Sequence, residues 1–96
     1  MRFNLDASVE RQVLIAEAMG VDTAVMSREQ AGRAASDAVA RLCRQLGLPE
    51  RLREVDVPEN GLARIAAATL HDRGLATNPK AITDAAPILD VLRNAW

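Results

Sequence analysis

The sequence predicts an all-α protein, a compact bundle of about four to five helices in which residues 1–96 form a single helical segment. Three observations lead to this fold class. Eighteen of the 96 residues are alanine, the residue with the strongest helix propensity. Apolar residues recur at helical spacing, and no stretch alternates as a β-strand does. Gly20, Gly47 and Gly74 follow periodic stretches, where helices end.

The first helix is expected from about Ser8 to Met19. Val9, Val13 and Ala16 are three or four residues apart, so they share one face of that helix. Gly20 follows directly and is predicted to stop the helix at its C-terminus, because glycine adopts the left-handed backbone conformation at little cost.

A second helix is predicted to open at Ser27, because Ser27 and Gln30 have the spacing of a capping box. Gly47 ends it, and Pro49 follows two residues later. Small residues in the first half of its apolar stripe should let a neighbouring backbone approach closely. The stripe consists of Ala31, Ala35, Ala38, Val39, Leu42 and Leu46.

A short helical turn is expected from Pro49 to Val55, and a third helix from about Glu59 to Asp72. The inward positions of this helix are predicted to be Leu62, Ile65, Ala66 and Thr69. Gly74 follows it, and Asn78 before Pro79 predicts a turn, since the residue before proline avoids the helical region.

Thr83 is predicted to cap the last helix, with Asp84 favourable in its first turn. Pro87 then falls in or just beyond the first turn, where a lost hydrogen bond costs least. The apolar face of this helix is predicted to consist of Ala85, Ile88, Leu89, Leu92 and Trp96.

The charge balance excludes several classes of partner. Twelve Lys and Arg against thirteen Asp and Glu leave a net charge of −1, with the signs interspersed. Nucleic-acid binders, including helix-turn-helix regulators, usually carry a basic face, so no nucleic acid is expected. No apolar run reaches membrane-spanning length, so no membrane partner is expected either. The single Cys43 cannot form an internal disulfide and fits a reducing, cytoplasmic setting.

Motifs alone predict no catalytic residue, no cofactor site and no metal ligand set. His71 is the only histidine, and it is interpreted as a cation near a helix C-terminus rather than a metal ligand or general base. Cys43 lies within a predicted helix without a histidine nearby, so core packing is favoured over a nucleophile. The five glycines stand singly and form no phosphate-binding loop.

Two arginine pairs could clamp an anion. Glutamates lie close to them in the sequence, which favours a solvated face with salt bridges instead. The residues concerned are Arg41, Arg44, Arg51 and Arg53, with Glu50 and Glu54.

The stretch from Gly74 to Lys80 is less polar than an ordinary surface loop. It joins two predicted helices and combines a glycine, apolar residues and an Asn-Pro turn. Two interpretations stay open at this point. The stretch covers the edge of the core, or it lines a pocket shared with a partner domain.

Seven short motifs follow one another along the chain in a family-specific order. They are Met1-Arg2-Phe3-Asn4, Ala18-Met19-Gly20-Val21, the Ser27 capping box, Gln45-Leu46-Gly47-Leu48-Pro49, Leu52-Arg53-Glu54-Val55, Ala76-Thr77-Asn78-Pro79-Lys80 and Ala95-Trp96. In this order they resemble the C-terminal end of the iron-containing (type III) alcohol dehydrogenases, in the branch of lactaldehyde reductases and ethanol or methanol dehydrogenases. The resemblance covers the whole chain and implies the C-terminal part of the helical domain of the dehydroquinate synthase-like and iron alcohol dehydrogenase fold.

The resemblance implies a larger two-domain enzyme that interconverts alcohols and aldehydes or ketones by hydride transfer. In the family an N-terminal α/β domain binds NAD(P), and the helical domain holds a divalent metal, usually iron and sometimes zinc, through an aspartate and three histidines. These ligands precede the segment that resembles Met1 to Asn4, so the chain is expected to lack them and the cofactor domain, and to be inactive alone. The resemblance assigns Gly74, Leu75 and Asn78 to the wall of the substrate pocket.

The expected partner is the upstream part of the same enzyme, with a small alcohol or aldehyde as its substrate. Without that part, apolar helix faces around Val13, Ala35, Val39 and Ile65 are expected to be uncovered and to cause self-association. The alternative is a free-standing helical protein-interaction module with no catalytic activity.

Overall fold

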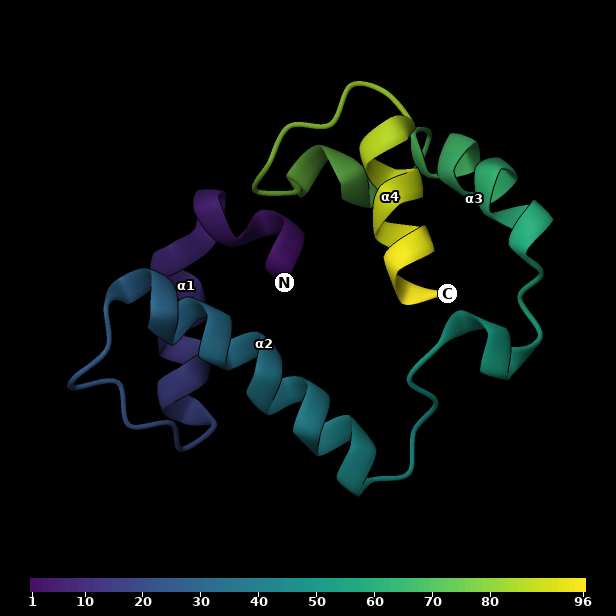
Figure 1. Cartoon of the computed structure of the whole chain (residues 1–96). Helices are drawn as coiled ribbons and strands as arrows, with labels where there is room; N and C mark the ends of the chain where they lie inside the picture. Colours follow the sequence, from purple (N-terminus) through teal and green to yellow (C-terminus); the bar gives the residue numbers. More distant parts are fainter. The chain divides into compact units, whose positions relative to one another are not determined.

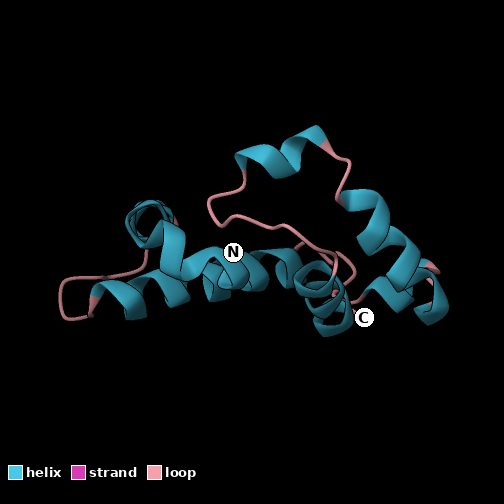
Figure 2. Ribbon diagram, turned by 90° about the horizontal axis from the view of Figure 1, so that it is seen from above, coloured by secondary structure: helices cyan, strands magenta, loops and turns pink.

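The computed structural model describes residues 1–96 and contains helices but no strand, which confirms the all-α prediction (Figures 1 and 2). The chain divides into two compact units, Met1–Leu48 and Pro49–Trp96. The α-helices are α1 (Leu5–Ala18), α2 (Arg28–Gln45), α3 (Leu62–Thr69) and α4 (Ala86–Ala95). Four short 3₁₀ helices accompany them: η1 (Arg2–Asn4), η2 (Leu52–Val55), η3 (Glu59–Gly61) and η4 (Arg73–Thr77). None of the helices combines the length and apolar character that crossing a membrane requires.

Helix α1 begins at Leu5, so the start predicted at Ser8 is wrong by three positions. Ser8 instead marks a kink, with non-helical dihedral angles of φ −147° and ψ 26°. Its hydroxyl donates a hydrogen bond to the main-chain carbonyl of Asn4 at 2.6 Å. Serine side chains compete in this way for backbone carbonyls, which explains why the residue resembles a helix start in the sequence.

Glycine ends both helices of the first unit, as predicted. Gly20 has φ +78°, in the left-handed region. The Val21 amide donates to the carbonyl of Ala16 at 3.0 Å, and the Gly20 amide donates to that of Glu17 at 2.9 Å. These two bonds form a Schellman motif, which satisfies carbonyls that the helix leaves unpaired. The same pattern recurs around Gly47, with φ +67°, at the end of α2.

The capping box that was predicted to open α2 is present. The Gln30 amide donates to the hydroxyl of Ser27 at 3.2 Å, and the Ser27 amide donates to Oε1 of Gln30 at 2.8 Å. The capping box therefore satisfies two main-chain N–H groups at the start of the helix, those of Ser27 and Gln30.

Small residues bring α1 and α2 close together, as expected from the first half of the α2 stripe. A Cβ added at Gly32 would lie 2.6 Å from Cδ1 of Leu5, so only glycine fits there without displacing a side chain. The core of this unit consists of Leu5, Val13, Ala16, Ala31, Ala35 and Ala38. Val13 and Ala35 are buried within the unit itself, so the expectation that they are uncovered is wrong.

The second half of the α2 stripe does not join this core. Val39 is half-buried, whereas Leu42 is 41% exposed and Leu46 is 64% exposed. The stripe was therefore predicted correctly as a pattern, but its larger side chains after Ala38 lack a covering element within the unit.

Helix α3 is shorter than the predicted span from Glu59 to Asp72. A 3₁₀ turn precedes it, and its C-cap is Leu70. Leu62 and Ala66 are 2% and 1% exposed, which confirms their inward positions. Ile65 is 38% exposed and lies outside the core of this unit, so its predicted inward position is wrong. This exposure agrees with the separate expectation that Ile65 is uncovered in the isolated chain.

Helix α4 begins at Ala86 with Ala85 as its N-cap, so the cap predicted at Thr83 is wrong. The Asp84 carboxylate accepts a hydrogen bond from the Ala86 amide at 2.8 Å and satisfies the first helical N–H group. Pro87 lies in the first turn, as predicted. Ile88 is the buried residue of this helix.

Candidate functional site

The stretch that was expected to be an apolar loop folds into the 3₁₀ turn η4. Its N-cap is Asp72, whose carboxylate Oδ1 accepts a hydrogen bond from the Gly74 amide at 2.6 Å. The Asp72 carbonyl also accepts from the Leu75 amide at 3.1 Å. One residue therefore provides both a side-chain and a main-chain acceptor for the start of the turn.

Thr77 closes the other side of the turn. Its hydroxyl donates a hydrogen bond to the carbonyl of Gly74 at 2.9 Å. The N–H and the C=O of Gly74 are thus both bound by side chains, one from Asp72 and one from Thr77. We call these two hydrogen bonds the Gly74 clamp.

The Asn-Pro turn that was predicted after η4 is present. Asn78 is extended, with φ −64° and ψ 133°, as proline requires of the residue before it. Its amide N–H donates to the carbonyl of Leu75 at 3.0 Å, and its side-chain Nδ2 donates to the carbonyl of Lys80 at 2.6 Å. Leu75 and Asn78 are half-buried, whereas Gly74 is exposed. The structure therefore brings all three predicted pocket-lining residues into one hydrogen-bonded segment.

Gly74 lies close to the Asp72 side chain, and it does not have a left-handed backbone. A Cβ added there would lie 2.9 Å from Oδ1 of Asp72, the same atom that accepts the Gly74 amide hydrogen bond. The sequence showed the glycine but not its close contact with the Asp72 carboxylate. The signal was Asp72, two residues before Gly74, because aspartate favours such short-range capping contacts.

The residues of this chain do not fit a metal ion. His71 is exposed beyond the end of α3, and its main-chain N–H donates to the carbonyl of Ala68 at 3.1 Å. No three His, Cys, Asp or Glu side chains are grouped so that they could hold a metal. Cys43 is half-buried rather than a core residue, which corrects its predicted position.

The four arginines of the predicted solvated face are exposed, and two of them contact the end of α4. Nη1 of Arg51 donates to the carbonyl of Asn94 at 2.8 Å. The guanidinium of Arg53 lies 5.6 Å from the ring centroid of Trp96. Cations favour helix C-termini and aromatic faces, which accounts for both contacts. The carboxylate of Glu54 accepts main-chain N–H groups instead.

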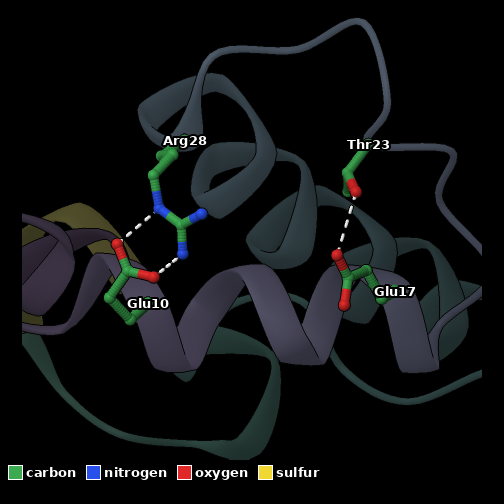
Figure 3. Close-up of polar contacts among 4 residues, drawn as sticks. All are labelled: Glu10, Glu17, Thr23 and Arg28. Carbon is green, nitrogen blue, oxygen red and sulfur yellow. Dashed lines mark hydrogen bonds and ion pairs between the residues drawn. The ribbon is translucent and has the colours of Figure 1, made fainter.

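The ion pairs of the first unit lie on its surface. Arg28 binds Glu10 across α1 and α2, and Thr23 donates to Glu17 at 3.1 Å (Figure 3). All four residues make exposed contacts. Contacts of this kind contribute little to stability, and nothing in their arrangement points to a site.

The sequence did not predict the two buried polar side chains, those of Gln12 and Ser36, of which Gln12 is the more buried. It is 3% exposed, and its Nε2 donates to the carbonyl of Met1 at 3.1 Å and to the hydroxyl of Ser8 at 2.9 Å. Gln12 therefore fixes the first residues of the chain against α1. Its position next to Val13 on the predicted inward face was the available signal.

Known proteins resemble this chain along its whole length. The sequence model of the "Fe-containing alcohol dehydrogenase family, C-terminal" matches residues 1–96. Lactaldehyde reductase of Escherichia coli (strain K12) is 38% identical over 96 residues, which are 100% of this chain and 25% of the reductase. 1,3-Propanediol dehydrogenase of Citrobacter freundii is 37% identical over 79 residues, 82% of this chain and 20% of that enzyme.

A crystal structure of 1,3-propanediol oxidoreductase superposes on this chain with a TM-score of 0.94 and 32% sequence identity. The superposition covers 99% of this chain and 25% of the oxidoreductase. The chain spans about a quarter of the length of the lactaldehyde reductase that it matches. These matches confirm the resemblance inferred from the order of the seven motifs, and the chain belongs to the Fe-containing alcohol dehydrogenase family, whose C-terminal region it matches from residue 1 to residue 96.

Proposed function

We propose that this chain forms the C-terminal helical part of a two-domain, metal-dependent alcohol dehydrogenase. The enzyme interconverts alcohols and aldehydes or ketones by transferring a hydride to or from NAD(P). The observation that supports this proposal is the match of the family model to all 96 residues, together with relatives about four times as long that are named as reductases and dehydrogenases. This full-length match favours the enzyme over a free-standing interaction module.

In this proposal the upstream part of the enzyme holds the nicotinamide and the iron or zinc. This chain lacks a group of metal-ligating side chains, which supports that division of labour. The lone free Cys43 supports a cytoplasmic location, where thiols stay reduced. Small-molecule alcohols or aldehydes are the substrates.

The part of this chain that we assign to the substrate pocket is the segment with Gly74, Leu75 and Asn78. Three side-chain hydrogen bonds restrain the main chain of this segment, and such pre-organisation favours a binding surface. The missing side chain at Gly74 makes the pocket wider at that point than a larger residue would.

A chimera tests the proposed function. Residues 1–96 replace the matching quarter of E. coli lactaldehyde reductase, and reduction of lactaldehyde is measured with NADH or NADPH in the presence of Fe²⁺ or Zn²⁺. We expect the chimera to turn over lactaldehyde, because this chain supplies the same helical framework. The parent reductase is the positive control, and the reductase truncated before the matching quarter is the negative control.

Circular dichroism and sedimentation show whether the chimera assembles as the parent does. A chimera that folds like the parent but reduces no aldehyde contradicts the proposal, and so does one that cannot assemble. Activity with lactaldehyde alone confirms the role of the chain but leaves its native substrate to be found by screening other aldehydes.

A further inference from the structure

We infer that Asp72 and Thr77 are positioning residues that set the size of the substrate pocket by fixing the main chain of Gly74. The inference rests on the proposed function, because it takes the segment around Gly74 as a wall of that pocket. Neither residue is expected to touch the substrate.

The two hydrogen bonds of the Gly74 clamp act on one residue from opposite sides. Asp72 accepts from the N–H at 2.6 Å, and Thr77 donates to the C=O at 2.9 Å. Because both peptide groups that flank the Gly74 Cα are held, neither can rotate without breaking a hydrogen bond. A glycine without such restraints would sample many backbone conformations.

A side chain at position 74 would lie close to one partner of the clamp. Any Cβ there would lie 2.9 Å from the Asp72 carboxylate oxygen that holds the amide. A side chain at position 74 would therefore require the exposed Asp72 carboxylate to shift from its present position.

The same unit contains matched hydrogen bonds that are not part of the wall. Asp84 accepts from the Ala86 amide two residues on, at 2.8 Å, as Asp72 does from Gly74. Thr69 donates its hydroxyl to the carbonyl of Ile65 at 2.8 Å, as Thr77 does to Gly74. Substitutions at Asp84 and Thr69 remove equivalent hydrogen bonds outside the pocket wall. They therefore show how the loss of such a bond affects kcat/KM when the wall itself is unchanged.

The test uses the lactaldehyde reductase chimera and the linear aldehydes propanal, butanal and hexanal. We expect Asp72→Ala and Thr77→Val each to lower kcat/KM for hexanal roughly tenfold, mainly through KM, but to lower that for propanal by about twofold or less. A mobile wall obstructs a long substrate more than a short one. The conservative variants Asp72→Asn and Thr77→Ser keep the hydrogen bonds and should restore the parental ratio of hexanal to propanal.

The control variants Asp84→Ala and Thr69→Val should change kcat/KM by the same factor for every aldehyde. Asp72→Ala and Thr77→Val overturn the inference if they behave like these controls in an active chimera. An inactive parental chimera contradicts the proposed function instead, so the two failures are distinguishable.

Amide exchange in the isolated chain tests the clamp without catalysis. In the parental chain, the Gly74 amide should exchange more slowly than in Asp72→Ala, by roughly threefold to tenfold, because the carboxylate protects it. Asp84→Ala should leave the Gly74 amide unchanged. Equal Gly74 exchange in the parent and in Asp72→Ala would mean that the carboxylate does not hold the turn, and the inference would be wrong.

Discussion

The indole Nε1 of Trp96 donates a hydrogen bond to the main-chain carbonyl of Val57 at 2.9 Å, although the two residues are 39 positions apart. Arg53 lies over the same ring, 5.6 Å from its centroid, and Arg51 donates to the carbonyl of Asn94 at 2.8 Å. We call these three contacts the C-terminal clasp. They join the chain around Val57 to the end of α4, so the second unit is closed by residues far apart in sequence.

Replacing Trp96 should therefore destabilise the second unit. Trp96→Phe keeps an aromatic ring for Arg53 but loses the indole N–H, so the free energy of unfolding should fall by about 1 kcal/mol. Trp96→Ala also loses the packing of a half-buried ring, and a fall of about 2–3 kcal/mol is expected. Urea unfolding followed by far-UV circular dichroism measures both. Arg64→Gln, an exposed change on α3, is the control, and a Phe variant as stable as the parent would contradict the clasp.

Gly32→Ala should destabilise the first unit, although alanine normally stabilises a helix interior by about 1 kcal/mol relative to glycine. The new Cβ would lie 2.6 Å from Cδ1 of the buried Leu5, so α1 or that side chain must move. Overpacking of this kind costs roughly 1–3 kcal/mol, which exceeds the gain in propensity.

Gly61→Ala is the matched control for Gly32→Ala, because a Cβ at Gly61 would make only an ordinary contact, 3.4 Å from Pro58. Thermal unfolding of both variants measures the difference. A more stable Gly32→Ala chain would show that α1 and α2 are not in close contact at this position.

The sequence predicted the helices well wherever a local signal marks an end. Gly20 and Gly47 stop their helices through Schellman motifs, and Ser27 opens α2 through its capping box, as expected. These signals depend on a few neighbouring residues, so they can be recognised without knowledge of the fold. The starts at Ser8 and Thr83 were wrong because serine, threonine and aspartate near a helix end offer several competing caps.

The burial of side chains was less predictable than the helices themselves. Leu42, Leu46 and Ile65 have the spacing of core residues but remain exposed in their units. Periodicity shows which face of a helix is apolar, but not which element covers it or whether this chain supplies that element. The Gly74 clamp and the C-terminal clasp were also missed, because each depends on distances that no spacing rule contains.

Asp72 and Gly74 should be coupled in a double-mutant cycle. Gly74→Ala brings a Cβ within 2.9 Å of the Asp72 carboxylate, so this change should destabilise the turn by about 1 kcal/mol. In an Asp72→Ala background the same change should cost little, because Asp72 supplies the only atoms within 4 Å of the added Cβ.

Amide exchange of Leu75 and Asn78 measures the cycle, since both amides donate hydrogen bonds within the turn. Gly61→Ala provides a glycine replacement outside the turn. Strictly additive effects of Asp72→Ala and Gly74→Ala would show that the two positions do not interact.

The isolated chain should bind neither a metal nor the nicotinamide. His71 is a single exposed histidine, and no group of three metal-ligating side chains surrounds it. Calorimetric titration with Fe²⁺, Zn²⁺ and NADH should therefore give no stoichiometric binding in the micromolar range. His71→Gln is the informative variant: any weak metal signal that it abolishes belongs to that imidazole alone. Saturable micromolar binding of one ion per chain would contradict the assignment of the ligands to the upstream part.

The isolated chain should self-associate through apolar side chains that its own units leave uncovered. In the first unit Leu14 is 65% exposed, Leu46 is 64% exposed and Leu48 is 50% exposed, in contrast to the buried Val13 and Ala35 that sequence analysis had favoured. Covering about 400 Å² of such surface would contribute roughly 10 kcal/mol, as much as the total stability of a small domain.

The combined variant Leu14→Gln and Leu46→Gln should therefore lower both the sedimentation coefficient and the binding of a hydrophobic dye. These side chains are mostly exposed, so helix content should stay the same by far-UV circular dichroism. Arg11→Gln, an exposed change on α1 that removes no apolar area, should leave the association unchanged. A parental chain that sediments as a monomer and binds no dye would show that these side chains tolerate water, and that association does not result from their exposure.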